Sequence, residues 1–117
     1  MFFRIENKKE GKIVAEKAML ADTFFSRLKG LLGTKKLDKG EALILEPCQS
    51  VHTFFMKYDL DIIFLNKENI VIGVAEHLKP NRLSAFYRHA SKAVELPSGS
   101  IVEGRVTVGE KLEFIQI

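Results

Sequence analysis

The stretch Cys48-Gln-Ser-Val-His-Thr-Phe-Phe-Met-Lys-Tyr-Asp-Leu-Asp-Ile-Ile-Phe-Leu65 is the most informative part of the chain. Four titratable side chains interrupt what otherwise reads as apolar strand sequence: His52, Lys57, Asp59 and Asp61. Ionisable groups are costly to bury unless they are paired. The stretch therefore predicts either a satisfied polar network inside the fold or a functional site.

Short β-rich runs continue on both sides of this stretch, and turn residues separate nearly all of them. The expected strands are 2–6, 12–17, 42–45, 51–58, 61–66, 70–76, 93–96, 101–106 and 112–117. Many short strands favour a mainly β fold, either an antiparallel β-sandwich or a partly open barrel, because parallel strands need long crossover connections.

One amphipathic helix is expected between Asp22 and Gly33. Its apolar residues recur at helical spacing: Phe24, Phe25, Leu28, Leu31 and Leu32. Asp22 can cap the first amides, and Gly33 can adopt the left-handed conformation that ends a helix. We expect the apolar stripe of this helix to pack on the sheet.

The composition indicates a globular protein. With 117 residues, 46% hydrophobic and 28% charged, the chain can bury one core, and we expect a single domain over residues 1–117. Cys48 is the only cysteine, which excludes an internal disulfide and fits a reducing compartment. The N-terminus lacks a secretory apolar region and no run is long enough to span a membrane, so we expect a cytoplasmic protein.

Polar residues outside the opening stretch could complete a site. Asp61 and Glu95 each lie within an apolar strand pattern, and each could simply face solvent. If they converge with His52 or Arg82, they would form a carboxylate cluster suited to acid/base work or cation binding. Cys48 and His52 would be roughly 13 Å apart along a strand, too far for a nucleophilic pair.

Motifs for cofactors and metals are missing from the sequence. His52, His77 and His89 do not have the spacing of metal ligands, and neither a phosphate-binding loop nor a dinucleotide fingerprint occurs. We expect no cofactor and no metal. The loop 79–92 interleaves basic residues with Phe86 and Tyr87, a pattern that can bind single-stranded nucleic acid. An aromatic pair in a loop more often holds that loop to the core, so nucleic acid is not the leading expectation.

Five ordered motifs resemble the domain of unknown function 192 (DUF192) family over nearly the whole chain. They are Arg27-Leu-Lys-Gly-Leu-Leu-Gly33, Val51-His-Thr-Phe-Phe-Met56, Leu60-Asp-Ile-Ile-Phe-Leu65, Leu78-Lys-Pro80 and Val94-Glu-Leu-Pro-Ser-Gly99. The resemblance implies a small β-rich, sandwich-like domain carrying a helix, and it implies no particular reaction. The recurrent polar positions of the family fall on His52, Met56, Asp61, Pro80, Glu95 and Gly99. The chain departs from the family pattern at Asp59, Ser98 and Glu110.

The leading hypothesis from the sequence is a binding module for a small polar ligand or a protein, with a groove beneath the loop 79–92. The candidate ligand-binding residues are His52, Met56, Lys57, Asp59, Asp61, Arg82 and Glu95. A hydrolase-like or metal-assisted enzyme using the same residues is the first alternative. Nucleic-acid binding through the basic loop is the second, and the oligomeric state is left open.

Overall fold

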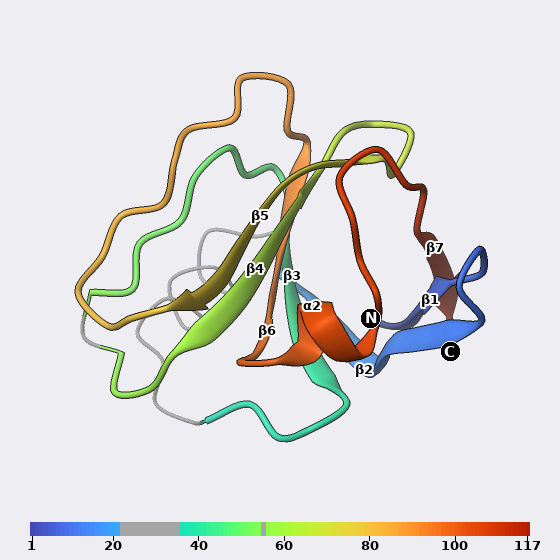
Figure 1. Cartoon of the computed structure of the whole chain (residues 1–117), viewed down its shortest axis with the longest axis horizontal. Helices are drawn as coiled ribbons and strands as arrows, with labels where there is room; N and C mark the ends of the chain where they lie inside the picture. Colours follow the sequence, from blue (N-terminus) through green and yellow to red (C-terminus); the bar gives the residue numbers. More distant parts are fainter. Residues whose placement is uncertain (22–35, 55) are drawn as a thin grey trace.

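The computed structural model describes residues 1–21, 36–54 and 56–117 and shows one seven-stranded sheet (Figure 1). The helix expected between Asp22 and Gly33 lies outside the described residues. The elements are β1 (Phe2–Asn7), β2 (Lys12–Ala21), β3 (Glu41–Leu45), β4 (Leu60–Leu65), β5 (Val71–Leu78), β6 (Lys92–Pro97), α2 (Ser100–Glu103) and β7 (Glu113–Gln116). The mainly β prediction is confirmed.

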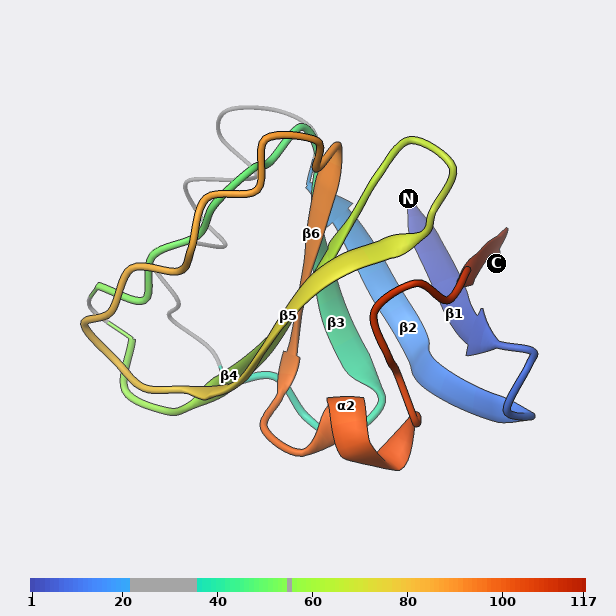
Figure 2. The ribbon, with the colours of Figure 1, turned by 45° about the horizontal axis from the view of Figure 1, so that its top comes forward.

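The strands are ordered β5-β4-β6-β3-β2-β1-β7 across the sheet. All neighbours pair antiparallel except β2 and β3, which run parallel. The chain between these two strands is 19 residues long, from 22 to 40, which is enough for the crossover that a parallel pair requires. The sheet is therefore mixed, and it curves without closing into a barrel (Figures 1 and 2).

Two hydrophobic clusters cover the two faces of the sheet. Ile63, Leu65, Val94 and Leu96 belong to the first cluster, together with residues from α2 and the segment after it. Ile62, Phe64 and Ala93 belong to the second, together with residues from the loops 46–59 and 79–91. Alternate residues of β4 thus enter opposite clusters, and all six are buried, as expected for a central strand covered on both sides.

Two sequence expectations are wrong in this region. The stretch 51–58 is not a strand: its only β pairing, in the described residues, is an isolated bridge between His52 and Leu83. The stretch 101–106 is not a strand either, because the helix α2 begins at Ser100 and is capped at its C-terminal end by Gly104. The β-branched residues that suggested a strand there include Ile101 and Val106, which instead fill the first hydrophobic cluster from α2 and the turn that follows.

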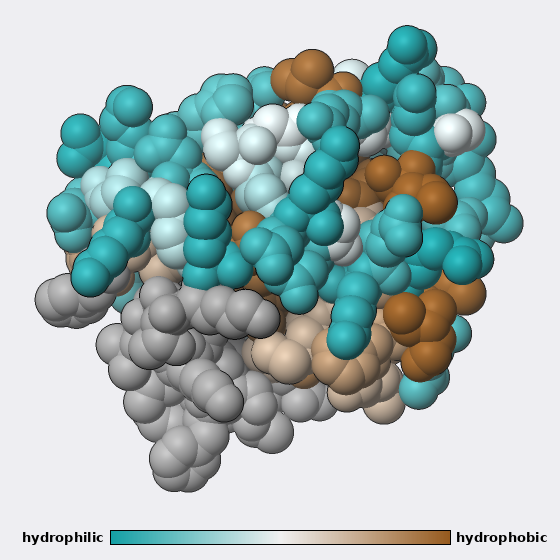
Figure 3. All heavy atoms as spheres, turned by 90° about the horizontal axis from the view of Figure 1, so that it is seen from below, coloured by the Kyte–Doolittle hydropathy of each residue, from teal (hydrophilic) through white to brown (hydrophobic). Residues whose placement is uncertain are grey.

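The loops 46–59 and 79–91 run side by side along one side of the molecule in both ribbon views (Figures 1 and 2). We call them the paired loops. On the face seen in Figure 3, apolar side chains form separate groups among hydrophilic ones. In the described residues, no helix is long and apolar enough to cross a membrane.

Candidate functional site

Asp61 is a buried anchor for the backbone. Its side chain is fully buried, and its two carboxyl oxygens accept three backbone N–H groups. Oδ1 accepts from His77 at 2.9 Å, and Oδ2 accepts from Gly99 at 3.1 Å and from Ile101 at 2.9 Å. His77 and Gly99 have positive φ angles of 53° and 97°. Asp61 therefore joins the end of β5 to the start of α2 and satisfies the backbone amides of His77 in β5 and of Gly99 and Ile101 at the start of α2.

Glu95 lies on the opposite face of the sheet from Asp61. In the antiparallel pairing of β4 with β6, Asp61 is opposite Leu96 and Ile62 is opposite Glu95. Paired residues share a face, so Asp61 lies with the first hydrophobic cluster and Glu95 with the second. The convergence of these two carboxyl groups, on which the predicted groove depended, does not occur.

Burial raises the pKa of Glu95 to about 7. In the described residues no cation forms an ion pair with its carboxyl group. The pKa of the nearby Tyr58 hydroxyl is raised, first by burial and second by the negative charge of Glu95. A backbone hydrogen bond with Leu37 lowers it. Glu95 is thus a titratable group inside an apolar cluster.

The remaining predicted site residues are dispersed. The His52 ring stacks on Phe54 with centroids 5.0 Å apart, and its buried Nδ1 has no hydrogen-bond partner among the residues that the structure describes. Met56 is buried in the second cluster. The other three are polar and lie at the surface: Lys57 is exposed, Asp59 is half-buried with its carboxylate 3.9 Å from Lys79 Nζ, and Arg82 is exposed. These residues do not form one groove with Asp61 and Glu95.

Residues that the sequence analysis did not single out hold the paired loops together. Thr53 Oγ1 accepts from the Arg82 backbone N–H at 2.9 Å and donates to the Lys79 carbonyl at 2.6 Å. Ser84 Oγ accepts from the Val51 N–H at 2.9 Å. A sequence signal for Thr53 was available: in an extended segment every second side chain faces the same way, so Thr53 faces inward with Val51.

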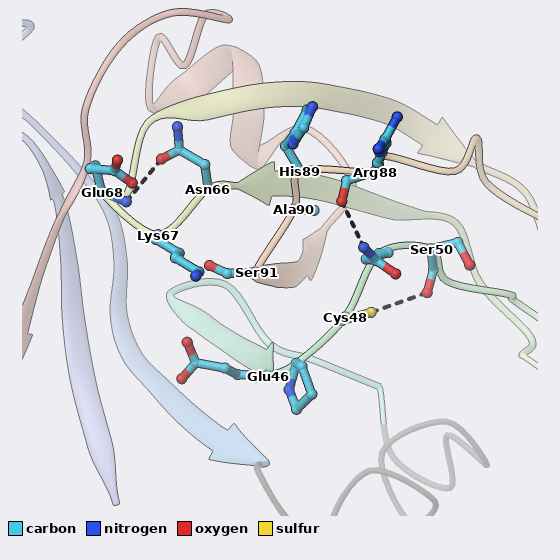
Figure 4. A pocket seen from close by; sticks show the side chains of 12 residues that line it. Glu46, Cys48, Ser50, Asn66, Lys67, Glu68, Arg88, His89, Ala90 and Ser91 are labelled. Atoms are coloured by element: carbon cyan, nitrogen blue, oxygen red, sulfur yellow. Dashed lines mark hydrogen bonds between the residues drawn. The ribbon is translucent and has the colours of Figure 1, made fainter.

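A polar hollow of about 1200 Å³ lies beside one end of the paired loops. Three segments wall it: 46–50, the β4–β5 turn at 66–68, and 88–91. Figure 4 shows Arg88 and His89 pointing the same way on one side, with Lys67 extending toward Ser91 from the turn. No residue of this hollow is among the predicted site residues.

Hydrogen bonds fix each wall of the hollow. Asn66 Oδ1 accepts the N–H groups of Glu68 and Ile70, both at 3.0 Å, which sets the turn. Gln49 Nε2 donates to the Arg88 carbonyl at 2.7 Å. The Cys48 thiol donates to the Ser50 carbonyl at 3.0 Å.

The charged groups of the hollow differ in whether they are already paired. Glu46 is 3.7 Å from Lys92 Nζ. Lys67, Arg88 and Glu68 form no ion pair with any residue that the structure describes. The unpaired groups are thus two cations and one carboxylate, with His89 beside them. Among the described residues, no group of three His, Cys, Asp or Glu side chains could hold a metal ion.

Comparison with known proteins gives consistent results. The DUF192 family model, described as an uncharacterised family, matches residues 5–114. A UPF0127 protein of Pyrococcus furiosus is 34% identical over 113 residues, covering 92% of this chain and 95% of that protein. A UPF0127 protein of Thermococcus sibiricus is 30% identical over 113 residues, covering 92% and 72%. A crystal structure of a protein of unknown function from Novosphingobium aromaticivorans shares the fold, with a TM-score of 0.79, 19% identity and coverage of 97% of this chain and 84% of that chain.

Proposed function

The chain belongs to the DUF192 family, and we propose that it is a binding module that takes a small organic anion in the polar hollow. The observation that carries the proposal is a concave site with three walls that hydrogen bonds fix within the protein itself. Small-molecule sites are usually concave and largely preformed, and preformed walls lower the entropic cost of binding. The proposed class of function, a binding module, is the one expected from the sequence. The proposed site is the hollow instead of a groove near His52, Asp61 and Glu95.

The unpaired charged groups of the hollow indicate the charge of the ligand. Arg88 and Lys67 can donate to carboxylate or phosphate oxygens, and Arg88 can do so through two parallel hydrogen bonds. Glu46 already faces Lys92, so its charge opposes an anion less than an unpaired carboxylate would. Glu68 remains as one carboxylate against two free cations. A ligand with two or more negative groups therefore suits the hollow better than an amine.

Thermal unfolding in the presence of matched small ions tests this proposal. Citrate, inorganic phosphate and the diamine putrescine are compared at equal ionic strength. A ligand that binds only the native state at 100 times its Kd adds about 2.7 kcal/mol of stability, which raises the midpoint by several degrees in a domain of this size. Citrate should raise the midpoint, and putrescine should not.

Charge variants separate the hollow from general electrostatic effects. Arg88→Ala and Lys67→Ala should each lose most of the citrate shift. Lys12→Ala removes an exposed lysine of β2 that does not line the hollow, so it should keep the shift. An equal response of all three variants, or a larger shift with putrescine, would show that the hollow does not select an anion.

A further inference from the structure

The paired loops carry both buried and exposed side chains. Val51, Thr53 and Ser84 point inward and are buried. Three apolar side chains lie on the outward side and remain open to solvent: Phe54 is 42% exposed, Phe86 66% and Leu83 68%. The outward side is thus an apolar surface on a framework of inter-loop hydrogen bonds.

The two loop aromatics that follow one another behave differently. The Tyr87 ring packs on Phe64, with centroids 4.5 Å apart, and also covers Gly73 of β5. Tyr87 therefore holds the loop to the core, as the sequence suggested for an aromatic pair. Phe86 is 66% exposed, so much of its ring remains available to a partner.

His52 and Phe54 form a second aromatic group on the paired loops. The bridge between His52 and Leu83 places these residues opposite each other, and the His52 ring stacks under Phe54 with an interplanar angle of 25°. Stacking on His52 limits the rotation of the Phe54 ring while leaving it partly open to solvent. An exposed ring that is already held in place can stack on another flat ring at little further entropic cost.

The paired loops carry an excess of positive charge. The paired loops contain four Lys or Arg residues and two carboxylates. Each carboxylate faces a lysine: Asp59 lies 3.9 Å from Lys79, and Glu46 lies 3.7 Å from Lys92. The other three loop cations, Lys57, Arg82 and Arg88, are exposed and form no ion pair with the described residues.

We propose that the outward side of the paired loops binds single-stranded nucleic acid, with bases stacking on Phe54 and Phe86 and phosphates pairing with Lys57, Arg82 and Arg88. Exposed rings interleaved with cations are the arrangement that recognises single strands without sequence preference. A duplex keeps its base faces stacked inside the helix and offers only its phosphates. An acidic peptide would use the cations and leave the rings without flat partners. The proposed surface shares Arg88 with the hollow, whereas Phe54, Phe86, Lys57 and Arg82 do not line the hollow.

Fluorescence anisotropy with a labelled 12-residue oligothymidine tests the proposal on the whole chain. The oligonucleotide should bind, and its affinity should fall with salt at a log–log slope of about −0.7 for each phosphate neutralised. Three pairing cations give a slope of about −2, so raising salt from 50 to 200 mM should weaken binding by roughly fifteenfold. Arg82→Ala should remove one phosphate contact and so make the log–log slope shallower by about 0.7.

Ring variants and a matched control identify the stacking contribution. Phe54→Ala and Phe86→Ala should each weaken binding at least about fivefold, since stacking a base on an aromatic ring is worth that much or more. Phe2→Ala is the control, because Phe2 is 37% exposed on β1 and lies outside the paired loops. The unfolding midpoint of each variant, measured in parallel, verifies that the variant remains folded. Phe86→Leu replaces Phe86→Ala if the alanine variant does not remain folded.

Three outcomes would overturn the inference. The first is no binding of the oligonucleotide at 50 mM salt. The second is equal affinity for a 12-base-pair duplex. The third is equal affinity for a 12-residue polyglutamate together with unchanged binding in the Phe54→Ala and Phe86→Ala variants, which would indicate an acidic protein partner. Phe54, Phe86 and Arg82 do not line the hollow, so their variants should weaken oligonucleotide binding and keep the citrate shift, and either proposal can fail while the other stands.

Discussion

Substitution of Asp61 by alanine should strongly destabilise the protein. The change removes both acceptor oxygens and leaves three N–H groups without their partner: that of Ile101, whose hydrogen bond is buried, and those of His77 and Gly99, whose hydrogen bonds are partly buried. An unsatisfied buried donor costs about 1–3 kcal/mol, so the upper bound for three is about 9 kcal/mol. Relaxation and entry of water into the vacated space reduce this figure. We expect a loss of about 3–5 kcal/mol, the range seen when one partner of a buried charged network is removed.

Urea unfolding measures this loss, with Asp59→Ala as the matched control. Asp59 is only two residues away, but its contact with Lys79 is long and partly exposed, so its removal should cost less than about 1 kcal/mol. Asp61→Asn should fall between the two variants. Its single carbonyl oxygen can still accept, whereas its amide nitrogen would face a backbone N–H donor.

A small loss of stability in Asp61→Ala would mean that these hydrogen bonds contribute little to folding. If its free energy of unfolding falls by no more than that of Asp59→Ala, the three hydrogen bonds do not anchor the backbone. If stability is unchanged but citrate binding is lost, Asp61 has a ligand-binding role and the assignment of the site to the hollow is wrong.

Three further predictions concern the second hydrophobic cluster and the paired loops. Burial raises the pKa of Glu95 from 4.5 to about 7, so the native state binds the extra proton between these values, and stability should be full below about pH 4.5, fall as pH rises to about 7 and then level off. Relative to Glu95→Gln, which cannot titrate, the wild type should lose up to about 3 kcal/mol between pH 4.5 and 8 in urea unfolding, and parallel pH profiles of the two proteins would disprove the shift. Gly73→Ala places a methyl carbon against the Tyr87 ring and should cost about 1–3 kcal/mol, with a changed near-ultraviolet circular dichroism spectrum; an unaltered spectrum and midpoint would mean that the ring does not cover Gly73. Thr53→Val keeps the shape of the side chain but leaves the Arg82 N–H without its acceptor, so amide hydrogen exchange at Arg82 should accelerate and stability should fall by about 1–2 kcal/mol. Unchanged exchange would argue against a stabilising role of the hydrogen bond between Arg82 and Thr53.

The strands were predictable because they depend on local pattern. Alternating or continuously apolar runs correctly indicated β1, β4, β5 and β6 to within a few residues. The segment 101–106 was misread because its β-branched residues favour a strand, whereas the turn at Gly99 and the start of α2 are fixed by Asp61, 40 residues away from Ile101. No local pattern reports such a contact.

The candidate site was harder to predict because it depends on register between strands. The sequence correctly marked Asp61 and Glu95 as unusual polar residues in apolar strands. Whether they meet is decided by the pairing of Asp61 with Leu96, and a shift of one residue would have placed both carboxyl groups on one face. The hollow combines three segments that are distant in sequence, and its walls contain ordinary surface residues such as Lys67 and Arg88, so no spacing or composition marks them in advance.

If the polar hollow is the ligand site, titration with citrate should locate the ligand there in the amide nuclear magnetic resonance spectrum of the protein. Saturable shifts should concentrate on the three wall segments, 46–50, 66–68 and 88–91, and should disappear in Arg88→Ala while remaining in Lys12→Ala. Saturable shifts centred on Asp61 or Glu95, or weak shifts spread over exposed lysines throughout the surface, would contradict the account.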